Sequence, residues 1–543
     1  MQSNSPSGAA SGTLIVFVGG AIVFISSAFI MTLELVAARL VAQHLGVSLY
    51  TWTAVIGVIL AGITLGNYAG GKLADIYPAR SLLTSLFLLS SVASLSVLLL
   101  VDWMGTWERP GYLSWPLWNL WAVTITFLGP AVILGTISPA AARLALTSGR
   151  QIGATLGSVY AAGAAGSILG TFLTGYVLIE RFGTKAIVIG IALGLGIMAL
   201  VAGMGLRRRP TNFVITWLIW AGLVGAATIG PWDWAEHWGH FFGLRFDTSE
   251  YHFEEESSYF SIEVYDAPEM ENTRVLALDH LVHSYVSMDD PTYLVYSYEG
   301  VYAELTRTLA PADRNWRAFF VGGGGYTFPR YLEALYPEAG IDVAEIDPAV
   351  TRAAHEALGL PLDTRISTWN MDARNFVNDH ARAVADGTKP PYDFVYGDAF
   401  NDLGVPYHLT TKGFNDALAA IMSPDGVYLI NVIDVYRPGY GRFIGSVVGT
   451  LQQTFPNVYV FSGEADGTSD ERDTFVVLSS QRRLPFAELA HSTNADAGTL
   501  FAWTENGRLG GDMRSLLRRG QHLVLTDQHA PVDNLLAPIF ALQ

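Results

Sequence analysis

Long, nearly uncharged apolar stretches dominate the first 231 residues of this 543-residue chain. A helix needs about 20 apolar residues to cross the hydrocarbon core of a lipid bilayer. Stretches of that length lie at about 14–43, 51–71, 81–101, 117–146, 153–179, 185–206 and 212–231. The first is too long for a signal peptide and has no basic residue before it, so we expect it to stay in the mature protein. The sequence therefore predicts a transmembrane helical bundle of about seven spans at 1–231.

Glycine is dense on several of these spans, as in GVILAGITLGNYAGG (57–71) and GAAGSILGTFLTG (163–175). Small residues three and four apart let helix backbones approach closely, which predicts tight packing. Glu34 and Arg39 are charged residues within or at the end of the first span. A charge at that depth costs about 2.5–3.5 kcal/mol, so each should face the bundle interior. An ion pair that fixes packing is favoured over a transport site, because the other spans carry almost no charge.

The charges divide the chain at residue 231. Residues 1–231 hold eleven Lys/Arg and five Asp/Glu, a net charge of +6, so the total of −17 leaves −23 for residues 232–543. An acidic region is a poor partner for nucleic acid and would attract a cation such as an amine. The chain has no Cys, which excludes disulfides, thiolate metal sites and a cysteine nucleophile. We predict no metal and no nucleic acid.

The loop charges give a conflicting indication of topology. Basic residues concentrate in the even-numbered loops, namely Lys72, Arg80, Arg143, Arg150, Arg207, Arg208 and Arg209, whereas the odd loops hold chiefly Arg109, Arg181 and Lys185. The positive-inside rule then places the even loops in the cytoplasm, and an odd span count exports the C-terminal region. Against this indication, we expect that region on the cytosolic side.

The pattern changes after the bundle. A Trp-rich segment at 231–241 is typical of a membrane interface, and the runs YFSIEVYD (259–266) and TRVLALD (273–279) are strand-like. Together they predict an interfacial segment and a small β-domain at 232–300. Five further strand-like runs alternate with helical stretches in 301–543; they lie at 317–325, 341–347, 365–372, 392–398 and 426–434. This alternation predicts a Rossmann-like, doubly wound parallel sheet whose ligand lies at the C-terminal strand ends.

The first two of these strands carry a nucleotide-binding pattern. The first ends in a glycine run that includes Gly322, Gly323 and Gly324, where the backbone can turn sharply and approach a ligand. Glu345 ends the second strand, where such folds place a carboxylate on the ribose hydroxyls. Asp347, which precedes a proline, is expected only to cap the next helix.

The third and fourth strands end in further acidic residues. In MDAR (371–374), Asp372 could accept a hydrogen bond from an adenine amino group or cap the following helix, and Ala373 lies beside it. In YGDAFND (396–402), Asp398 and Asp402 converge where a ligand must lie. Group transfer to an amine needs a group that orients and deprotonates an ammonium. We therefore assign Asp398 and Tyr396 to catalysis and Asp402 to the substrate; a structural turn is the alternative for each aspartate.

The motifs GGGG, AEID, DAR and GDAF resemble the spermine/spermidine synthase family over about residues 250–540. A bacterial subset of that family, fused to a membrane bundle, is similar in ELVAARL (34–40), LGNYAGGKLAD (65–75), SVYAAGAAGSILGTFLTGY (158–176) and LTDQHAPVDNLL (525–536). The resemblance implies an aminopropyltransferase of the bacterial inner membrane. It implies decarboxylated S-adenosylmethionine as co-substrate, no tightly bound cofactor, an amine acceptor such as putrescine, and a homodimer formed through the soluble domain.

The chain departs from the soluble enzymes in the half of the site that binds the amine. Their glycine loop reads GGGDG, where this chain has Gly325 and Tyr326, and their paired carboxylates lie three apart rather than four. The resemblance assigns Asp279 and Tyr259 to substrate binding, together with His283, which stands where the family has Gln. Another family Gln is Phe260 here. Two alternatives stay open: a methyltransferase that uses intact S-adenosylmethionine, and a non-enzymatic sensor, transporter or complex subunit.

Overall fold

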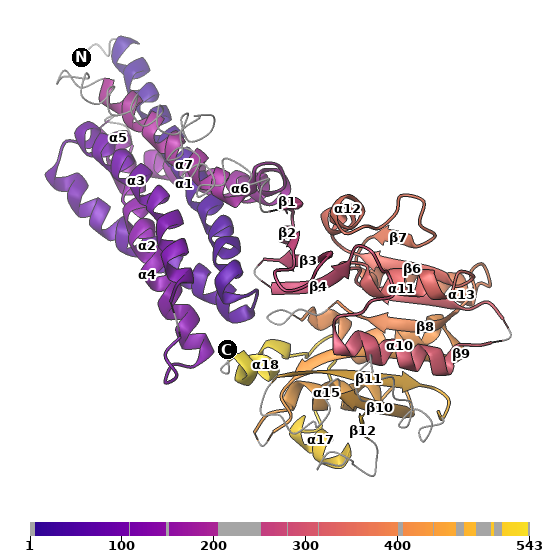
Figure 1. Cartoon of the computed structure of the whole chain (residues 1–543). Helices are drawn as coiled ribbons and strands as arrows, with labels where there is room; N and C mark the ends of the chain where they lie inside the picture. Colours follow the sequence, from indigo (N-terminus) through magenta and orange to yellow (C-terminus); the bar gives the residue numbers. More distant parts are fainter. Residues whose placement is uncertain are drawn as a thin grey trace. The chain divides into compact units, whose positions relative to one another are not determined.

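The chain forms two compact units, Met1–Asp247 and Thr248–Gln543, in a computed structural model (Figure 1). The structure describes residues 6–107, 109–147, 151–204, 251–279, 281–312, 314–399, 405–437, 439–462, 472–484, 501–503 and 513–540. The predicted seventh span, the Trp-rich segment and Asp402 lie outside these residues.

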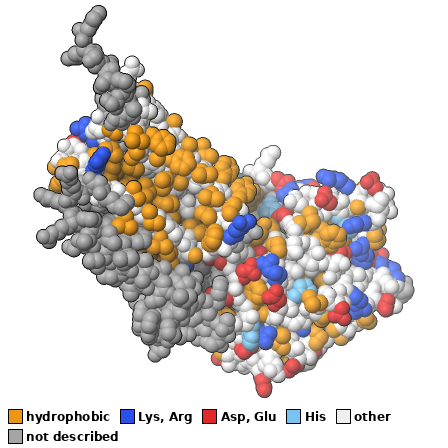
Figure 2. All heavy atoms as spheres, turned by 90° about the horizontal axis from the view of Figure 1, so that it is seen from above, with side chains coloured by type: hydrophobic (Ala, Val, Ile, Leu, Met, Phe, Trp, Pro, Cys, Tyr) orange, Lys and Arg blue, Asp and Glu red, His pale blue; other side chains and the backbone are white. Residues whose placement is uncertain are grey.

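The described part of the first unit is entirely helical apart from its short connections. Its elements are α1 (Pro6–Leu45), α2 (Leu49–Ile76), α3 (Ala79–Gly105), α4 (Trp115–Gly135), α5 (Ile137–Leu146), α6 (Ile152–Leu173), the π-helical turn η1 (Thr174–Leu178) and α7 (Ile179–Met204). Six stretches in the described residues are long and apolar enough to cross a membrane, with α4 and α5 counted as one and α6 and η1 as another. Figure 2 shows hydrophobic side chains over much of the visible face of this unit.

Glycines set the closest helix contacts of the bundle, as predicted. A Cβ at Gly166 of α6 would lie 2.0 Å from the carbonyl oxygen of Phe24 in α1. A Cβ at Gly66 of α2 would lie 2.2 Å from the carbonyl oxygen of Val132 in α4. Any larger residue would force these helices apart. Glu34 is partly buried, and its Oε2 has no hydrogen-bond partner among the described residues.

The second unit holds two sheets. The smaller is an antiparallel meander of β1 (Phe253–Glu256), β2 (Ser261–Asp266), β3 (Thr273–Leu278) and β4 (Leu281–Ser287). The larger contains β5 (Arg317–Val321), β6 (Gly340–Glu345), β7 (Ser367–Asn370), β8 (Tyr392–Gly397), β9 (Met422–Asp434), β10 (Asn457–Ser462), β11 (Asp473–Ser480) and β12 (Phe501–Trp503). Its order is β12-β10-β11-β9-β8-β5-β6-β7.

The five predicted strands, β5 to β9, pair in parallel, whereas β11 is antiparallel to β9, and β10 is antiparallel to both β11 and β12. The sheet is therefore mixed rather than wholly parallel. Chain order reverses between β5 and β8, and a doubly wound sheet binds its ligand outside the strand ends at such a point.

Helices cover both faces of the larger sheet. They are α10 (Ser297–Leu309), α11 (Thr327–Leu335), α12 (Pro348–Ala357), α13 (Ala373–Ala385), the 3₁₀ turn η2 (Tyr407–Leu409), α14 (Lys412–Ile421), α15 (Arg442–Leu451), α17 (Met513–Arg519) and α18 (Val532–Phe540). Successive strand residues point to opposite faces. In β5, Phe319 stacks on Phe376 of α13 with ring centroids 4.6 Å apart, while Phe320 stacks on Tyr396 of β8 at 4.7 Å. Both faces of β5 are thus apolar because both are covered.

Candidate active site

The switch point brings the ends of β5 and β8 together. Gly322 directly follows β5 with a φ of 96°, which is strained for any residue with a Cβ. A Cβ there would also lie 2.5 Å from the carbonyl oxygen of Asp398, which directly follows β8. Glycine is therefore required at 322 for the two chains to pass this closely, and it brings Asp398 beside the glycine loop.

The amides of the glycine loop are already engaged. Glu345, the last residue of β6, accepts hydrogen bonds through Oε2 from the amides of Gly323 at 2.8 Å and Gly324 at 3.4 Å. The amide of Gly325 donates to Ser284 Oγ of β4 at 2.9 Å. Loop amides of this kind hold phosphate in dinucleotide-binding folds. Here a carboxylate occupies that position, which disfavours a phosphate and suits a nucleoside without one.

Glu345 itself is only 6% exposed. Burial raises the pKa of its carboxyl, and backbone hydrogen bonds from Asp347 and Gly323 oppose this rise. Asp347 caps α12 by accepting from the amide of Ala349 at 2.9 Å, with Pro348 at the first helical position, as the sequence predicts. The side chain of Glu345 is therefore fixed at the strand end by its own loop and by the start of the next helix.

The third strand end is built in the same way. Asp372 caps α13 by accepting from the amide of Asn375 at 3.1 Å, which is one of its two predicted roles. Its Oδ2 lies 2.9 Å from Nε2 of His408 in η2, and burial is moderate for both side chains. His408 lies 36 residues further along the chain, and no sequence motif points to it.

A cavity of about 150 Å³ lies among these strand ends. The predicted site residues that line it are Gly322, Gly324, Glu345, Asp372, Ala373, Asp398 and His283. The volume is below the roughly 300–1,000 Å³ of sites that enclose a whole ligand, so a bound nucleoside would extend beyond it. The lining holds three carboxylates and two histidines, and no Lys or Arg among the described residues. Its charge favours a cationic ligand.

Asp398 is held by two neighbours without an opposing charge. Its Oδ2 accepts from the hydroxyl of Tyr298 in α10 at 3.0 Å, and its Oδ1 accepts from Nδ2 of Asn431 in β9 at 2.6 Å. Burial raises the pKa of Asp398, and these two hydrogen bonds partly counteract the rise. Within the described residues, no Lys or Arg lies within ion-pair distance of this carboxylate.

A second buried carboxyl lies close by. Glu299 of α10 is 4% exposed, and burial together with the charge of Asp398 raises its pKa well above the ordinary value. Its Oε2 is buried without a hydrogen-bond partner among the described residues, and so is Oδ1 of Asn431. Buried acceptors without donors are costly. A ligand that brings several N–H donors and a positive charge would satisfy Glu299, Asn431 and Asp398 together.

Tyr396, which the sequence assigns to catalysis, lies in the hydrophobic core. It is fully buried, its ring stacks on Phe320, and its hydroxyl lies 2.7 Å from Thr306 Oγ1 of α10. It does not line the cavity, because α10 covers the sheet face to which this strand position points. The tyrosine hydroxyl that contacts Asp398 belongs instead to Tyr298 of the same helix.

The other predicted substrate residues lie on or next to the small sheet. Asp279 occupies the β3–β4 turn with a φ of 57°, and its Oδ1 accepts from the amide of Ser261 at 3.0 Å. Tyr259 is 45% exposed, and burial together with nearby carboxylates, Asp347 first, raises its pKa. His283 lines the cavity, and burial lowers its pKa to about 4, so it is neutral at pH 7. Only His283 of these three lines the cavity.

No group of three or more His, Cys, Asp or Glu side chains that could hold a metal ion occurs in the described residues. The side chains at the cavity that could take part in chemistry are carboxylates and histidines, with the Tyr298 hydroxyl in contact with Asp398. These groups can hold a cation and accept a proton.

Known proteins resemble this chain at modest identity. It is 27% identical over 180 residues to the polyamine aminopropyltransferase of Vibrio vulnificus, which covers 30% of this chain and 58% of that protein. It is 25% identical over 173 residues to a probable polyamine aminopropyl transferase of Bifidobacterium longum, and this match covers 32% of this chain and 36% of that protein. The eEF1A lysine and N-terminal methyltransferase of Bos taurus is 26% identical to the chain over 189 residues, and this match covers 33% of this chain and 25% of that protein.

These relatives support the resemblance to the spermidine synthase family. The chain spans 58% or less of the length of each of them. A crystal structure of a probable spermidine synthase from Corynebacterium glutamicum aligns with a TM-score of 0.42 at 18% identity, covering 51% of this chain and 96% of that one. No family model matches the chain.

Proposed function

We propose that the second unit transfers an aminopropyl group from decarboxylated S-adenosylmethionine to an amine such as putrescine, and that the first unit embeds the protein in a bacterial inner membrane. The curated aminopropyltransferases support the reaction class. The six long apolar helices support the membrane location. Because the nucleotide is made in the cytosol, we place the second unit on the cytosolic side.

The acidic lining of the cavity is the observation that carries this proposal. Decarboxylated S-adenosylmethionine is a dication at neutral pH, with a sulfonium and an ammonium. Intact S-adenosylmethionine adds a carboxylate, which would need a cationic or amide partner. The described lining holds Glu345, Asp372 and Asp398 and no Lys or Arg, and the loop amides are engaged by Glu345 and Ser284. The decarboxylated form matches this charge better.

In the proposed binding mode, Glu345 contacts the ribose hydroxyls and Asp372 the adenine amino group, with the glycine loop against the nucleoside. Asp398 then holds the acceptor amine at the cavity, and the unpartnered oxygens of Glu299 and Asn431 are proposed as further acceptors for that amine. Asp402 is proposed as a further amine ligand. These roles place the acceptor ammonium next to carboxylates, and the sulfonium and ammonium of the nucleotide would lie in the same acidic cavity.

The transfer is a single in-line displacement. The acceptor loses a proton to Asp398, and its nitrogen attacks the aminopropyl carbon next to the sulfonium. The new C–N bond forms as the C–S bond breaks, and the electron pair of that bond stays on sulfur. The products are a secondary amine and methylthioadenosine, a neutral thioether. Tyr298 orients the Asp398 carboxylate throughout.

Methyl transfer from intact S-adenosylmethionine to an amine is the second candidate. The match to a lysine and N-terminal methyltransferase favours it, because that protein's name describes methylation of amino groups. An acidic amine pocket would serve both reactions. The two candidates differ in the nucleotide consumed and in the nucleoside released.

The test uses the full chain in lipid nanodiscs, supplied with either nucleotide and a panel of di- and polyamines. Mass spectrometry of the products distinguishes the reactions, since aminopropyl transfer releases methylthioadenosine and methyl transfer releases S-adenosylhomocysteine. We expect amine-dependent methylthioadenosine. Amine-dependent S-adenosylhomocysteine would replace the proposal by the second candidate, and no turnover with either nucleotide would refute both.

A further inference from the structure

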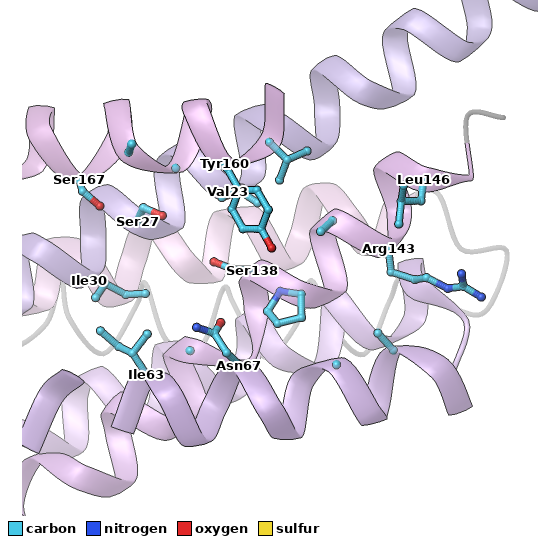
Figure 3. Close-up of a pocket in the computed structure, with 18 of the residues that line it drawn as sticks. Val23, Ser27, Ile30, Ile63, Asn67, Ser138, Arg143, Leu146, Tyr160 and Ser167 are labelled. Carbon is cyan, nitrogen blue, oxygen red and sulfur yellow. The ribbon is translucent and has the colours of Figure 1, made fainter. Parts of the chain in front are cut away.

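The first unit contains a cavity of about 740 Å³ that neither the transfer reaction nor the helix packing explains (Figure 3). Residues from α1, α2, α5 and α6 line it, together with the end of α4. On α2 the lining runs from Asp75 through Asn67 to Ile63, which is about 18 Å at 1.5 Å per residue. The cavity therefore extends from one end of the bundle to about half the thickness of a bilayer core.

The lining is layered by polarity along this direction. Asp75 and Arg143 lie at the end where α2 and α5 finish. Figure 3 shows Asn67, Ser138 and Tyr160, from three different helices, around the middle of the cavity, with Arg143 toward one end. At the opposite end, Figure 3 shows Ile30 and Ile63 together with the hydroxyl side chains of Ser27 and Ser167. Along the cavity the lining is first charged, then hydrogen-bonding, and finally apolar with two serine hydroxyls.

The polar groups of this lining are not used by the protein. Within the described residues, neither Asp75 nor Arg143 forms an ion pair, and the side chains of Asn67, Ser138 and Tyr160 form no hydrogen bond. Four of these five side chains are exposed, Tyr160 to 74%, and Ser138 is partly buried, so a ligand in the cavity can reach them. A polar group that meets only hydrocarbon in a bilayer core costs several kcal/mol. A ligand that carries one positive charge, one negative charge, uncharged hydrogen-bonding groups and an apolar chain would satisfy the whole set.

We propose that this cavity binds a zwitterionic phospholipid with a primary amine headgroup, the ethanolamine type. Its phosphate contacts Arg143, its ammonium donates to Asp75, and its ester region meets Asn67, Ser138 and Tyr160. An acyl chain follows Ile30 and Ile63. An anionic lipid would match Arg143 but would leave Asp75 facing negative charge. The inference rests on the membrane embedding proposed above and is independent of the transferase reaction.

The full chain, reconstituted in nanodiscs of mixed phosphatidylethanolamine and phosphatidylglycerol, tests this site. A trace of either lipid carries a photoreactive group on its acyl chain, and the cross-linked peptides are identified by mass spectrometry. We expect the ethanolamine lipid to label the cavity-lining segments of α1, α2 and α6 more strongly than the glycerol lipid does. Native mass spectrometry should show that lipid retained after delipidation.

Two variants probe the headgroup contacts. Arg143→Gln and Asp75→Asn should each reduce cavity labelling by about tenfold, the scale of one lost charge-assisted hydrogen bond. Arg80→Gln is the matched control, because Arg80 is a charged residue five positions after Asp75 that does not line the cavity. Melting temperatures confirm that each variant is folded.

Three results would overturn the proposal. One is labelling by the two lipids in proportion to their abundance, which means that the cavity only admits bulk lipid. Another is preferential labelling by the glycerol lipid, which means an anionic-lipid site. The third is cavity labelling of the folded Arg143→Gln and Asp75→Asn variants that is as strong as in Arg80→Gln. Because cross-linking is read without turnover, failure of the proposed reaction leaves these outcomes interpretable.

Discussion

Replacing Asp398 by Asn should abolish turnover and leave the nucleoside site intact. An amide has the size of the carboxylate and can still accept from Asn431 and donate to the hydroxyl oxygen of Tyr298, so the contacts at 2.6 Å and 3.0 Å can persist. What the amide lacks is the ability to take a proton and to hold an ammonium by charge. A positioned base contributes ~10²–10⁴-fold, or about 3–5 kcal/mol of barrier.

Stability gives an internal check on that variant. Because burial raises the pKa of Asp398 in the folded protein, ionisation of its carboxyl above that pKa lowers the free energy of unfolding. The neutral amide removes this cost, so Asp398→Asn should keep or increase the melting temperature at pH 8. If the loss of activity came from unfolding, the melting temperature of the variant would fall instead.

Methylthioadenosine release and calorimetric binding of methylthioadenosine are the two assays. We expect a rate loss of at least ~10²-fold with nucleoside affinity within a few fold of wild type. Asp425→Asn is the control, because Asp425 lies on β9 with a side chain that is 73% exposed, opposite the cavity end of the strand. Rates within threefold of wild type with either nucleotide and every amine would make Asp398 structural and refute the mechanism.

Three further predictions concern the same unit. Glu345→Gln should weaken methylthioadenosine binding by about 1–3 kcal/mol in calorimetry, the scale of a lost charged acceptor, and unchanged affinity would remove Glu345 from the site. Tyr298→Phe removes a hydrogen bond that lowers the pKa of Asp398. Activity needs the ionised base, so the acidic limb of the pH profile of kcat/KM should move to higher pH, and an unmoved limb would contradict this. A tag after Gln543 should be protected from protease in intact spheroplasts; digestion while cytosolic markers survive would place the unit outside.

The central strands and their ligand-binding edge could be predicted from the sequence because both depend on local patterns. Alternating strand and helix runs fix β5 to β9, and the short buried strands end close to where polar residues begin. Gly322, Glu345 and Asp372 follow from position alone, since a doubly wound sheet gathers its strand ends at one edge. The strands β10, β11 and β12 join the sheet in antiparallel pairings. The sequence did not predict them, because the alternation of strand and helix runs marks only the parallel part of the sheet.

The amine half of the site depends on contacts that no motif encodes. Tyr298 and Glu299 come from α10, about 100 residues before Asp398, and Asn431 comes from the neighbouring strand. Sequence proximity favoured Tyr396, but the face covered by α10 makes it a core residue. A signal existed in the sequence: SYEGVYAEL (297–305) combines a buried helical face with an acidic residue on it. Only the fold shows that this face meets the end of β8.

Gly325, where the soluble enzymes have Asp, is explained by packing, and this leads to a last prediction. A Cβ at 325 would lie 2.6 Å from Cβ of Ser284 and 2.8 Å from Cγ2 of Val286, both in β4. Gly325→Asp alone should therefore lower the free energy of unfolding by about 1–3 kcal/mol, the usual cost of overpacking, and should not raise activity.

Relieving the contact from the β4 side should separate packing from chemistry. Ser284→Gly removes the nearest atom, so the double variant Gly325→Asp with Ser284→Gly should recover part of the lost stability relative to Gly325→Asp, with Ser284→Gly alone as the matched control. Chemical denaturation measures the coupling between the two positions, which should exceed about 0.5 kcal/mol for residues in contact. If the two substitutions prove additive, β4 does not exclude a side chain at 325. The missing carboxylate would then reflect the substrate of this protein rather than the way its small sheet packs on the glycine loop.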